Sequence, residues 1–211
     1  MDRRGRIAAQ RGYAGLLRLV RQWEATDTVA TNELEKIMDS LTRLDYISPP
    51  HVGLLGIASL NAQAATAAHS SLKRRGQESS DRLVKFQAEM ESIVTSLDEL
   101  AEEVSGNTSA DVLPQPGPVR LSACDLPAAL GAVRAGADAL RKENALRRSL
   151  LAALEELRSQ KGAGGTSQAE DERRRLLLVW SERPYTCAEE GSQLSLLKRR
   201  SQDSLERLEK A

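Results

Sequence analysis

The sequence predicts an all-α protein, an elongated antiparallel helical bundle or coiled coil with long helices and a short C-terminal helical cap. Three observations support this fold class. Apolar residues recur at alternating steps of three and four along most of the chain, which is the period of a helix face. Aromatic residues make up only 3% of the sequence, while Ala, Leu, Glu and Arg are abundant, as in long helices. No segment shows the alternation of apolar and polar residues that is typical of strands.

Residues 1–47 form the first predicted region, an amphipathic helical segment whose helix begins near Ile7 and ends at Ile47. Between its two apolar halves, Thr26–Thr28 predicts a break or kink, because Thr and Asp side chains compete for backbone hydrogen bonds. Pro49 and Pro50 then stop the helix. The apolar positions are Leu16, Leu17, Leu19, Val20 and Trp23 in the first half and Leu34, Ile37, Met38, Leu41, Leu44 and Ile47 in the second.

Residues 48–107 form the second region, a long heptad helix, and they carry the clearest periodicity in the chain. Its apolar seam is spaced at alternating steps of three and four, which is the a/d pattern of a coiled coil. Upstream, the same register meets Gly76 and Ser79, so we expect a weak or broken seam near Gly76. The members of the seam are Leu83, Phe86, Met90, Ile93, Leu97, Leu100 and Val104.

Residues 108–124 are rich in Pro and Gly and predict a semi-rigid linker. Residues 125–160 then form a second coiled-coil helix, with Asp125 as its N-cap and Pro127 in its first turn. Its seam meets Asn144 and continues in a shifted register through Leu146, Leu150, Leu154 and Leu157. Because the linker lets the chain reverse, we expect this helix to pair with the heptad seam within one chain.

Residues 161–211 form a C-terminal helical cap and an amphipathic tail helix. After a glycine-rich break, Ser167 to Glu170 match a capping box, with Ser167 as the N-cap of a short helix. Pro184 stops that helix, and a last helix is expected over residues 189–209.

Charge and cysteine content exclude several classes of protein. Lys and Arg number 30, and Asp and Glu also number 30, so the chain lacks the basic surplus of a nucleic-acid coat. No stretch approaches the roughly 20 apolar residues of a membrane span. Cys124 and Cys187 are far apart and form no disulfide framework, which fits a reducing compartment. We therefore expect no specific nucleic-acid binding and no membrane binding.

Arginines cluster at several places without dominating the chain. The first twenty residues are Arg-rich and acid-poor, as in mitochondrial transit peptides, but they also form an amphipathic helix, which we favour. The triplets that begin at Lys73, Arg173 and Lys198 could serve nuclear import or phosphate contact. We favour the alternative that these side chains flank apolar seams and cover them.

No catalytic constellation is present in the sequence. Gly162–Gly165 lacks the Lys-Ser/Thr of a phosphate-binding loop, and His51 and His69 have no metal-ligand spacing around them. We therefore expect no enzyme activity, no cofactor and no metal.

The segment from Leu176 to Tyr185 is the most unusual cluster. Its four consecutive apolar residues and Trp180 cover most of a helix circumference, which predicts burial on more than one side. Trp, Tyr and Arg are also common anchors of interfaces. The segment therefore either packs into the protein's own bundle or faces a partner, and both can hold at once.

The same segment resembles the Trp-x-x-x-Pro-Tyr signature of the cyclin-dependent kinase 2-interacting protein family. The segment from Leu16 to Glu24, an apolar helix with Trp23-Glu24 at its end, resembles that family's N-terminal Leu-rich motif. The order of helices and linkers is also similar. Tyr13, Thr186-Cys187 and the Ala-rich stretch 52–75 depart from the family pattern.

This resemblance implies a nuclear adaptor, with the cytoplasm as a further location, and a hetero-oligomeric assembly. Its implied partners are cell-cycle kinases, checkpoint proteins or AAA-type ATPase subunits, in DNA replication, the DNA damage response or ribosome maturation. The alternative is a structural coiled-coil subunit of a kinetochore, centrosome or tethering complex. The expected protein-binding residues are Trp23, Trp180, Arg183, Pro184 and Tyr185. We expect Trp180 to pack near Trp23, with Arg183 and Tyr185 at the rim of that cluster.

Overall fold

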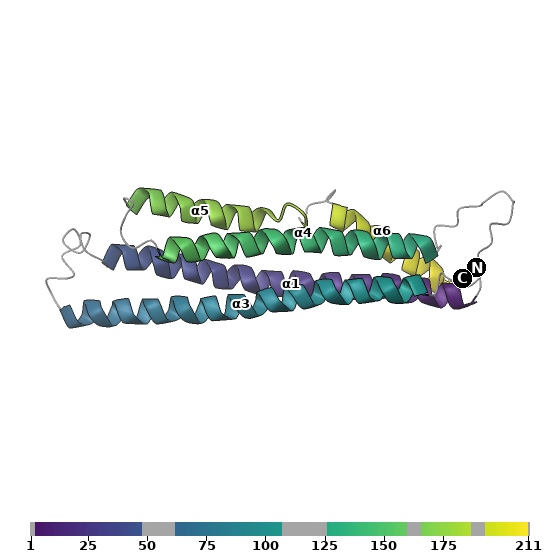
Figure 1. Cartoon of the computed structure of the whole chain (residues 1–211), viewed down its shortest axis with the longest axis horizontal. Helices are drawn as coiled ribbons and strands as arrows, with labels where there is room; N and C mark the ends of the chain where they lie inside the picture. The colour runs from purple at the N-terminus through teal and green to yellow at the C-terminus, as the bar shows by residue number, and fades with distance from the viewer. Residues whose placement is uncertain (1–2, 48–61, 107–125, 160–165, 187–192, 211) are drawn as a thin grey trace. The chain divides into compact units, whose positions relative to one another are not determined.

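The structure of the chain is a computed structural model that describes residues 3–47, 62–106, 126–159, 166–186 and 193–210. These residues form five helices and no strand, so the predicted all-α fold class is confirmed (Figure 1). The helices are α1 (Arg3–Ile47), α3 (Ala62–Gly106), α4 (Leu126–Ser159), α5 (Thr166–Glu182) and α6 (Gln193–Lys210).

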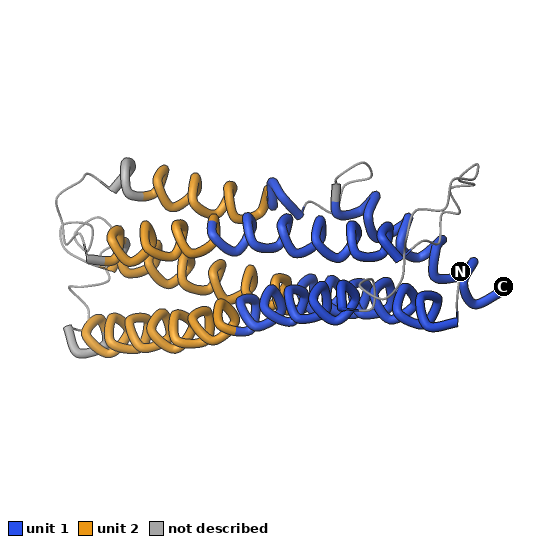
Figure 2. The backbone as a smooth tube through the Cα atoms, turned by 45° about the vertical axis from the view of Figure 1, so that its right-hand side comes forward, with its two compact units in different colours: residues 1–25, 89–145, 183–211 blue, residues 26–88, 146–182 orange. Residues whose placement is uncertain are grey.

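The helices divide between two compact units (Figure 2). Unit 1 comprises residues 1–25, 89–145 and 183–211, and unit 2 comprises residues 26–88 and 146–182. Segments of α1, α3 and α4 occur in both units. The fourth helix of unit 1 is α6, whereas the fourth helix of unit 2 is α5.

In unit 1, α3 and α6 both run antiparallel to α1. Gly12 lies against Val104, and Gly15 lies against Leu100. Residue numbers therefore rise along α1 in the direction in which they fall along α3. The carbonyl oxygen of Leu208 near the end of α6 accepts hydrogen bonds from Arg6 and Gln10 near the start of α1. A core of small and apolar side chains fills this end of the unit: Ala8, Ala9, Tyr13, Val104, Leu126, Ala129 and Leu208.

In unit 2, α3 and α5 both run antiparallel to α1. Arg82 of α3 lies 3.6 Å from the carboxylate of Glu33, and Gly76 lies against Ser40 further along α1. The guanidinium of Arg173 near the start of α5 bonds to Asp45, and the indole of Trp180 near its end bonds to Thr31.

The predicted pairing of the heptad seam with the next helix is confirmed within each unit. In unit 1, Arg141 of α4 bonds to Asp98 of α3 at 2.7 Å, and in unit 2, Ser80 of α3 donates to Glu155 of α4 at 3.1 Å. The helix α1 also packs on α3, so the seam serves a bundle rather than one pair. Phe86 and Leu100 of the seam are half-buried, and the fully buried members are Leu83, Met90, Ile93, Leu97 and Val104.

The break expected at Thr26–Thr28 is wrong, because α1 is helical throughout this segment, while the alternative of a kink there stays a prediction. The hydroxyl of Thr31 bonds to the carbonyl oxygen of Asp27 one turn back, at 2.9 Å, and so stays within the helix. The carboxylate of Asp27 forms an ion pair with Arg147 of α4. A tertiary partner therefore overrides the local tendency to break the helix.

The helix α3 is continuous near Gly76, and Leu72, Gly76 and Ser79 are all buried, so the seam is not broken there, while its expected weakness stays a prediction. The predicted capping box lies at the start of α5, which begins one residue before Ser167, at Thr166. Pro127 lies in the first turn of α4 as predicted.

The register after Asn144 also differs from the predicted shift. Leu154 is buried as expected, but Leu146, Leu150 and Leu157 are only half-buried, while Arg147 is fully buried. The original spacing of three and four therefore continues past Asn144. The linker 108–124, Asp125, the glycine-rich break, His51 and both cysteines lie outside the described residues.

Candidate protein-binding site

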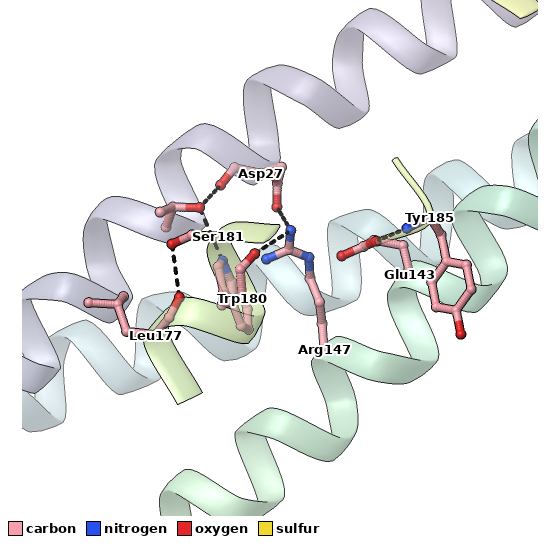
Figure 3. Close-up of polar contacts among 8 residues, drawn as sticks. Asp27, Glu143, Arg147, Leu177, Trp180, Ser181 and Tyr185 are labelled. Atoms are coloured by element: carbon pink, nitrogen blue, oxygen red, sulfur yellow. Dashed lines mark hydrogen bonds and ion pairs between the residues drawn. The ribbon is translucent and has the colours of Figure 1, made fainter. Parts of the chain in front are cut away.

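Trp180, the central residue of the predicted site, is packed inside unit 2. Its side chain is 1% exposed, and its indole Nε1 donates a hydrogen bond to the hydroxyl of Thr31 at 3.1 Å. The guanidinium of Arg147 lies over the ring, with Cζ 4.1 Å from the ring centroid. Figure 3 shows Trp180 beside Arg147 and Asp27. The indole is therefore an internal anchor of α5 and does not meet solvent.

Arg147 links three helices through one buried guanidinium. Its NH2 nitrogen lies 2.7 Å from Asp27 Oδ1 of α1 in an ion pair. The same nitrogen donates a hydrogen bond to the carbonyl oxygen of Trp180 of α5 at 3.5 Å (Figure 3). Both members of the ion pair are buried. Removing two charges from water costs several kcal/mol per ion, and a cation stacked on an indole recovers part of that cost.

The position of this guanidinium also suits the end of α5. The last carbonyl groups of a helix have no partner within it, and the helix dipole places negative charge there. The carbonyl of Trp180 belongs to the last turn of α5, which ends at Glu182. Arg147 therefore acts as a buried cation near the C-terminus of α5 and links the last turn of this helix to α1 and α4.

In unit 1, the chain leaves α5 through a tight turn over Arg183–Thr186. The N–H of Thr186 donates to the carbonyl oxygen of Arg183 at 3.0 Å, and Pro184 takes the second position, where its fixed φ is favoured. Arg183 has a φ of 47°, in the left-handed region that glycine usually fills after a helix. Pro184 stops the helix as predicted.

A buried carboxylate holds this turn in place. Glu143 of α4 is fully buried, and its Oε2 accepts a hydrogen bond from the backbone N–H of Tyr185 at 3.1 Å (Figure 3). Residues in rarely populated backbone conformations persist only where the surrounding structure determines them. The bond to Glu143 is such a determinant, because it fixes the backbone two residues after Arg183.

The structure brings three of the five predicted residues together on this turn. Pro184 and Tyr185 are exposed, with Tyr185 at 45%, and Arg183 is half-buried. Trp180 is buried in unit 2 and Trp23 is buried in unit 1, so both indoles have a packing role. The expected packing of Trp180 near Trp23 remains a prediction.

The outer face of α5 differs from what the sequence predicted. Of the four consecutive apolar residues, Leu176 and Leu177 are half-buried, whereas Leu178 is 60% exposed and Val179 is 38% exposed. The helix is therefore buried on one side only. Two large apolar side chains are left on the surface beside Arg174, Arg175 and Glu182.

Two charged groups outside these sites have shifted pKa values. Burial raises the pKa of the Glu33 carboxyl, but hydrogen bonds from Lys36 and Ser79 and the charges of Lys36 and Arg82 outweigh it, so the pKa is lowered overall. In unit 1, a hydrogen bond to Asp98 raises the pKa of Arg141. Both groups are charged at neutral pH, as structural ion pairs require.

The three basic triplets have different surroundings. Arg173 is buried and bonded to Asp45, which agrees with a packing role. Lys198 is half-buried and bonded to Glu24 at 2.6 Å. The triplet that begins at Lys73 is exposed throughout.

The parts of the chain that the structure describes contain no group of three or more His, Cys, Asp or Glu residues that could hold a metal ion. Within those same parts, no helix is long and apolar enough to cross a membrane. No protein family, curated protein or solved structure matches this chain.

Sequence reasoning missed Asp27, Arg147 and Glu143. A signal for the first two was present in the periodicity. Asp27 continues the α1 seam between Trp23 and Ala30, and Arg147 continues the α4 seam after Leu140 and Asn144. Opposite charges at seam positions of two helices indicate a buried pair. Glu143 had no such signal, because its partner is a backbone N–H.

Proposed function

We propose that this protein is a non-catalytic adaptor that binds other proteins through helical surfaces and the turn after α5. The observation that carries the proposal is the turn Arg183–Thr186. It combines a left-handed Arg183, a buried carboxylate bonded to the Tyr185 backbone and an exposed phenol. A conformation that is costly and held by a buried group, yet ends in an exposed aromatic side chain, suits recognition better than packing.

The class of partner follows from the family resemblance. We propose a nuclear complex linked to cell-cycle kinases, to DNA replication or checkpoint signalling, or to an AAA-type ATPase assembly in ribosome maturation. The structural coiled-coil alternative required helices that extend as a rod. The antiparallel return of α3 along α1, seen in each unit by itself, supports the adaptor.

The test is a comparison of captured partners for two variants in unit 1. Tyr185→Ala removes the exposed phenol, and Leu196→Ala is its matched control, because Leu196 is an apolar side chain with a similar exposure of 43%. Neither change should alter the helical circular dichroism signal. Affinity purification with quantitative mass spectrometry should show that Tyr185→Ala loses a defined set of partners and that Leu196→Ala retains it.

A second variant tests the carboxylate of Glu143, which supports the turn, separately from the exposed side chain of Tyr185. Glu143→Gln keeps the size of the side chain and retains an acceptor oxygen but removes the charge, so it should weaken the same partners less than Tyr185→Ala does. If Tyr185→Ala remains folded and captures every partner as the wild type does, the turn is not the docking element.

A further inference from the structure

The exposed stripe of α5 has a charge pattern that is complementary to itself. Arg175, Leu178, Val179 and Glu182 follow steps of three, one and three, so they lie on one face of the helix. All four side chains are exposed. A basic residue lies at one end of this stripe, an acidic residue at the other, and two apolar residues lie between them.

We propose that this stripe, Arg175–Glu182, is a contact between two copies of the chain, with the two α5 helices antiparallel. When two identical helices pair about a two-fold axis between Leu178 and Val179, each Leu178 meets the Val179 of the second copy. Each Arg175 then meets the Glu182 of the second copy, at both ends of the contact. A two-fold interface requires this kind of self-complementary surface.

The opposite orientation is disfavoured by the same charges. In a parallel pair, Arg175 would meet Arg175, and Glu182 would meet Glu182, which places like charges together. Arg174, the neighbouring cation, does not disturb the antiparallel pair, because it bonds to Glu170 within its own helix at 2.5 Å. The charges therefore select one orientation and one register.

The rest of α5 leaves this face available. Arg173 and Trp180 hold the helix to unit 2 from the opposite side, through Asp45, Thr31 and Arg147. A contact formed by one helix face is smaller than the roughly 1,200–2,000 Å² of a stable interface, so the dimer should be weak and reversible. This contact is independent of the turn at Tyr185, and either can exist without the other.

Sedimentation of the full chain from about 5 μM to about 500 μM covers the range in which so small an interface would associate. The apparent mass should rise toward that of a dimer at the upper end. Raising the salt concentration should lower the association, because the two flanking ion pairs are exposed. Leu178→Ser should keep the chain monomeric throughout.

Charge reversal tests the register directly. Arg175→Glu and Glu182→Arg should each weaken self-association about tenfold, because each places like charges opposite one another. The double variant Arg175→Glu/Glu182→Arg should restore it, since the ion pairs are re-formed with their members exchanged. Val84→Ser is the control, because Val84 is another exposed apolar residue of unit 2, at 64%, on α3.

Three results would overturn the proposal. The first is a wild-type chain that stays monomeric over the whole concentration range, in which case this face binds a different protein or none. The second is a Leu178→Ser variant that associates as the wild type does. The third is a double charge-reversal variant that remains as weak as either single variant.

Discussion

Unit 1 and unit 2 are each built from four helical segments, but their interiors are packed by different means. In unit 1, helices approach closely at glycines. A Cβ built on Gly136 would lie 2.6 Å from Leu16 Cδ1, and one built on Gly15 would lie 2.7 Å from Leu100 Cδ2. In unit 2, the interior contains an ion pair, Asp27 with Arg147, and the buried carboxylate of Glu33. Unit 1 also holds a buried carboxylate, Glu143, but its partner is a backbone N–H.

The two interiors should therefore respond to different changes. Close contacts at glycines depend on shape and tolerate no added volume. A buried ion pair contributes little net stability, because desolvation offsets the attraction, but removing one member leaves an uncompensated charge. We infer that the glycine contacts of unit 1 are sensitive to added size, whereas the buried ion pair of unit 2 is sensitive to the loss of either of its members.

The largest expected effect is a new charge in the unit 1 seam. Leu97→Asp places a carboxylate at a fully buried position of α3 and should lower the free energy of unfolding by about 4 kcal/mol or more. Urea denaturation followed by circular dichroism measures this. Thr95→Asp, which adds the same charge at an exposed position of α3, should stay within about 0.5–1 kcal/mol of the wild type.

The next largest effect is expected in unit 2, where a substitution removes one member of the buried ion pair. Arg147→Met leaves Asp27 buried without its cation and should cost about 3–5 kcal/mol in the same assay. The double variant Asp27→Leu/Arg147→Met removes both charges and should recover most of that loss. Equal stability of Arg147→Met and the wild type would show that the pair is not buried as described.

A size change should affect unit 1 moderately. Gly136→Leu adds volume against Leu16 and should lower the free energy of unfolding by about 1–3 kcal/mol. Gly131→Leu is the matched control on α4, because a Cβ there meets no atom within 4 Å. The control should gain up to about 1 kcal/mol, since leucine forms helices better than glycine does. Equal effects at both glycines would contradict the close contact.

The smallest effect depends on pH and concerns Glu33 of unit 2. Glu33→Gln should cost about 1 kcal/mol at neutral pH, through weakened hydrogen bonds. Because the pKa of Glu33 is lowered in the folded chain, its contribution is complete above the unfolded value of about 4.3 and is lost as the pH falls through the folded pKa. Denaturation curves of both proteins should therefore converge in acid, and a gap that widened there would contradict the sign.

The sequence predicted most of the helical structure, because local rules determine it. The heptad from Leu83 to Val104 required burial along one face, and Pro184 cannot continue a helix. Both features depend only on nearby residues. The predicted break at Thr26–Thr28 failed for the opposite reason. Asp27 bonds to Arg147, 120 positions away in the sequence, and no local rule detects such a partner.

The sequence indicated the residues of the candidate site but not the side chains that hold those residues in place. Trp180, Pro184 and Tyr185 are conspicuous in a chain with few aromatics. Arg147, which lies against the indole, was marked only by its place in the α4 seam, and Glu143, which bonds to the Tyr185 backbone, had no sequence signal at all. The outer face of α5 was misjudged for a related reason, since four consecutive apolar residues do not reveal which of them a neighbouring helix covers.

The placement of the two tryptophans allows indole fluorescence to report on each unit separately. There are two tryptophans in the sequence, and one is buried in each unit: Trp23 in unit 1 and Trp180 in unit 2. Trp23→Phe leaves all indole fluorescence in unit 2, and Trp180→Phe leaves it all in unit 1. The emission maximum of each single-tryptophan chain then reports the exposure of one unit's indole to water during denaturation. Coincident curves would identify a single cooperative transition, and separated curves would give each unit its own midpoint without a label.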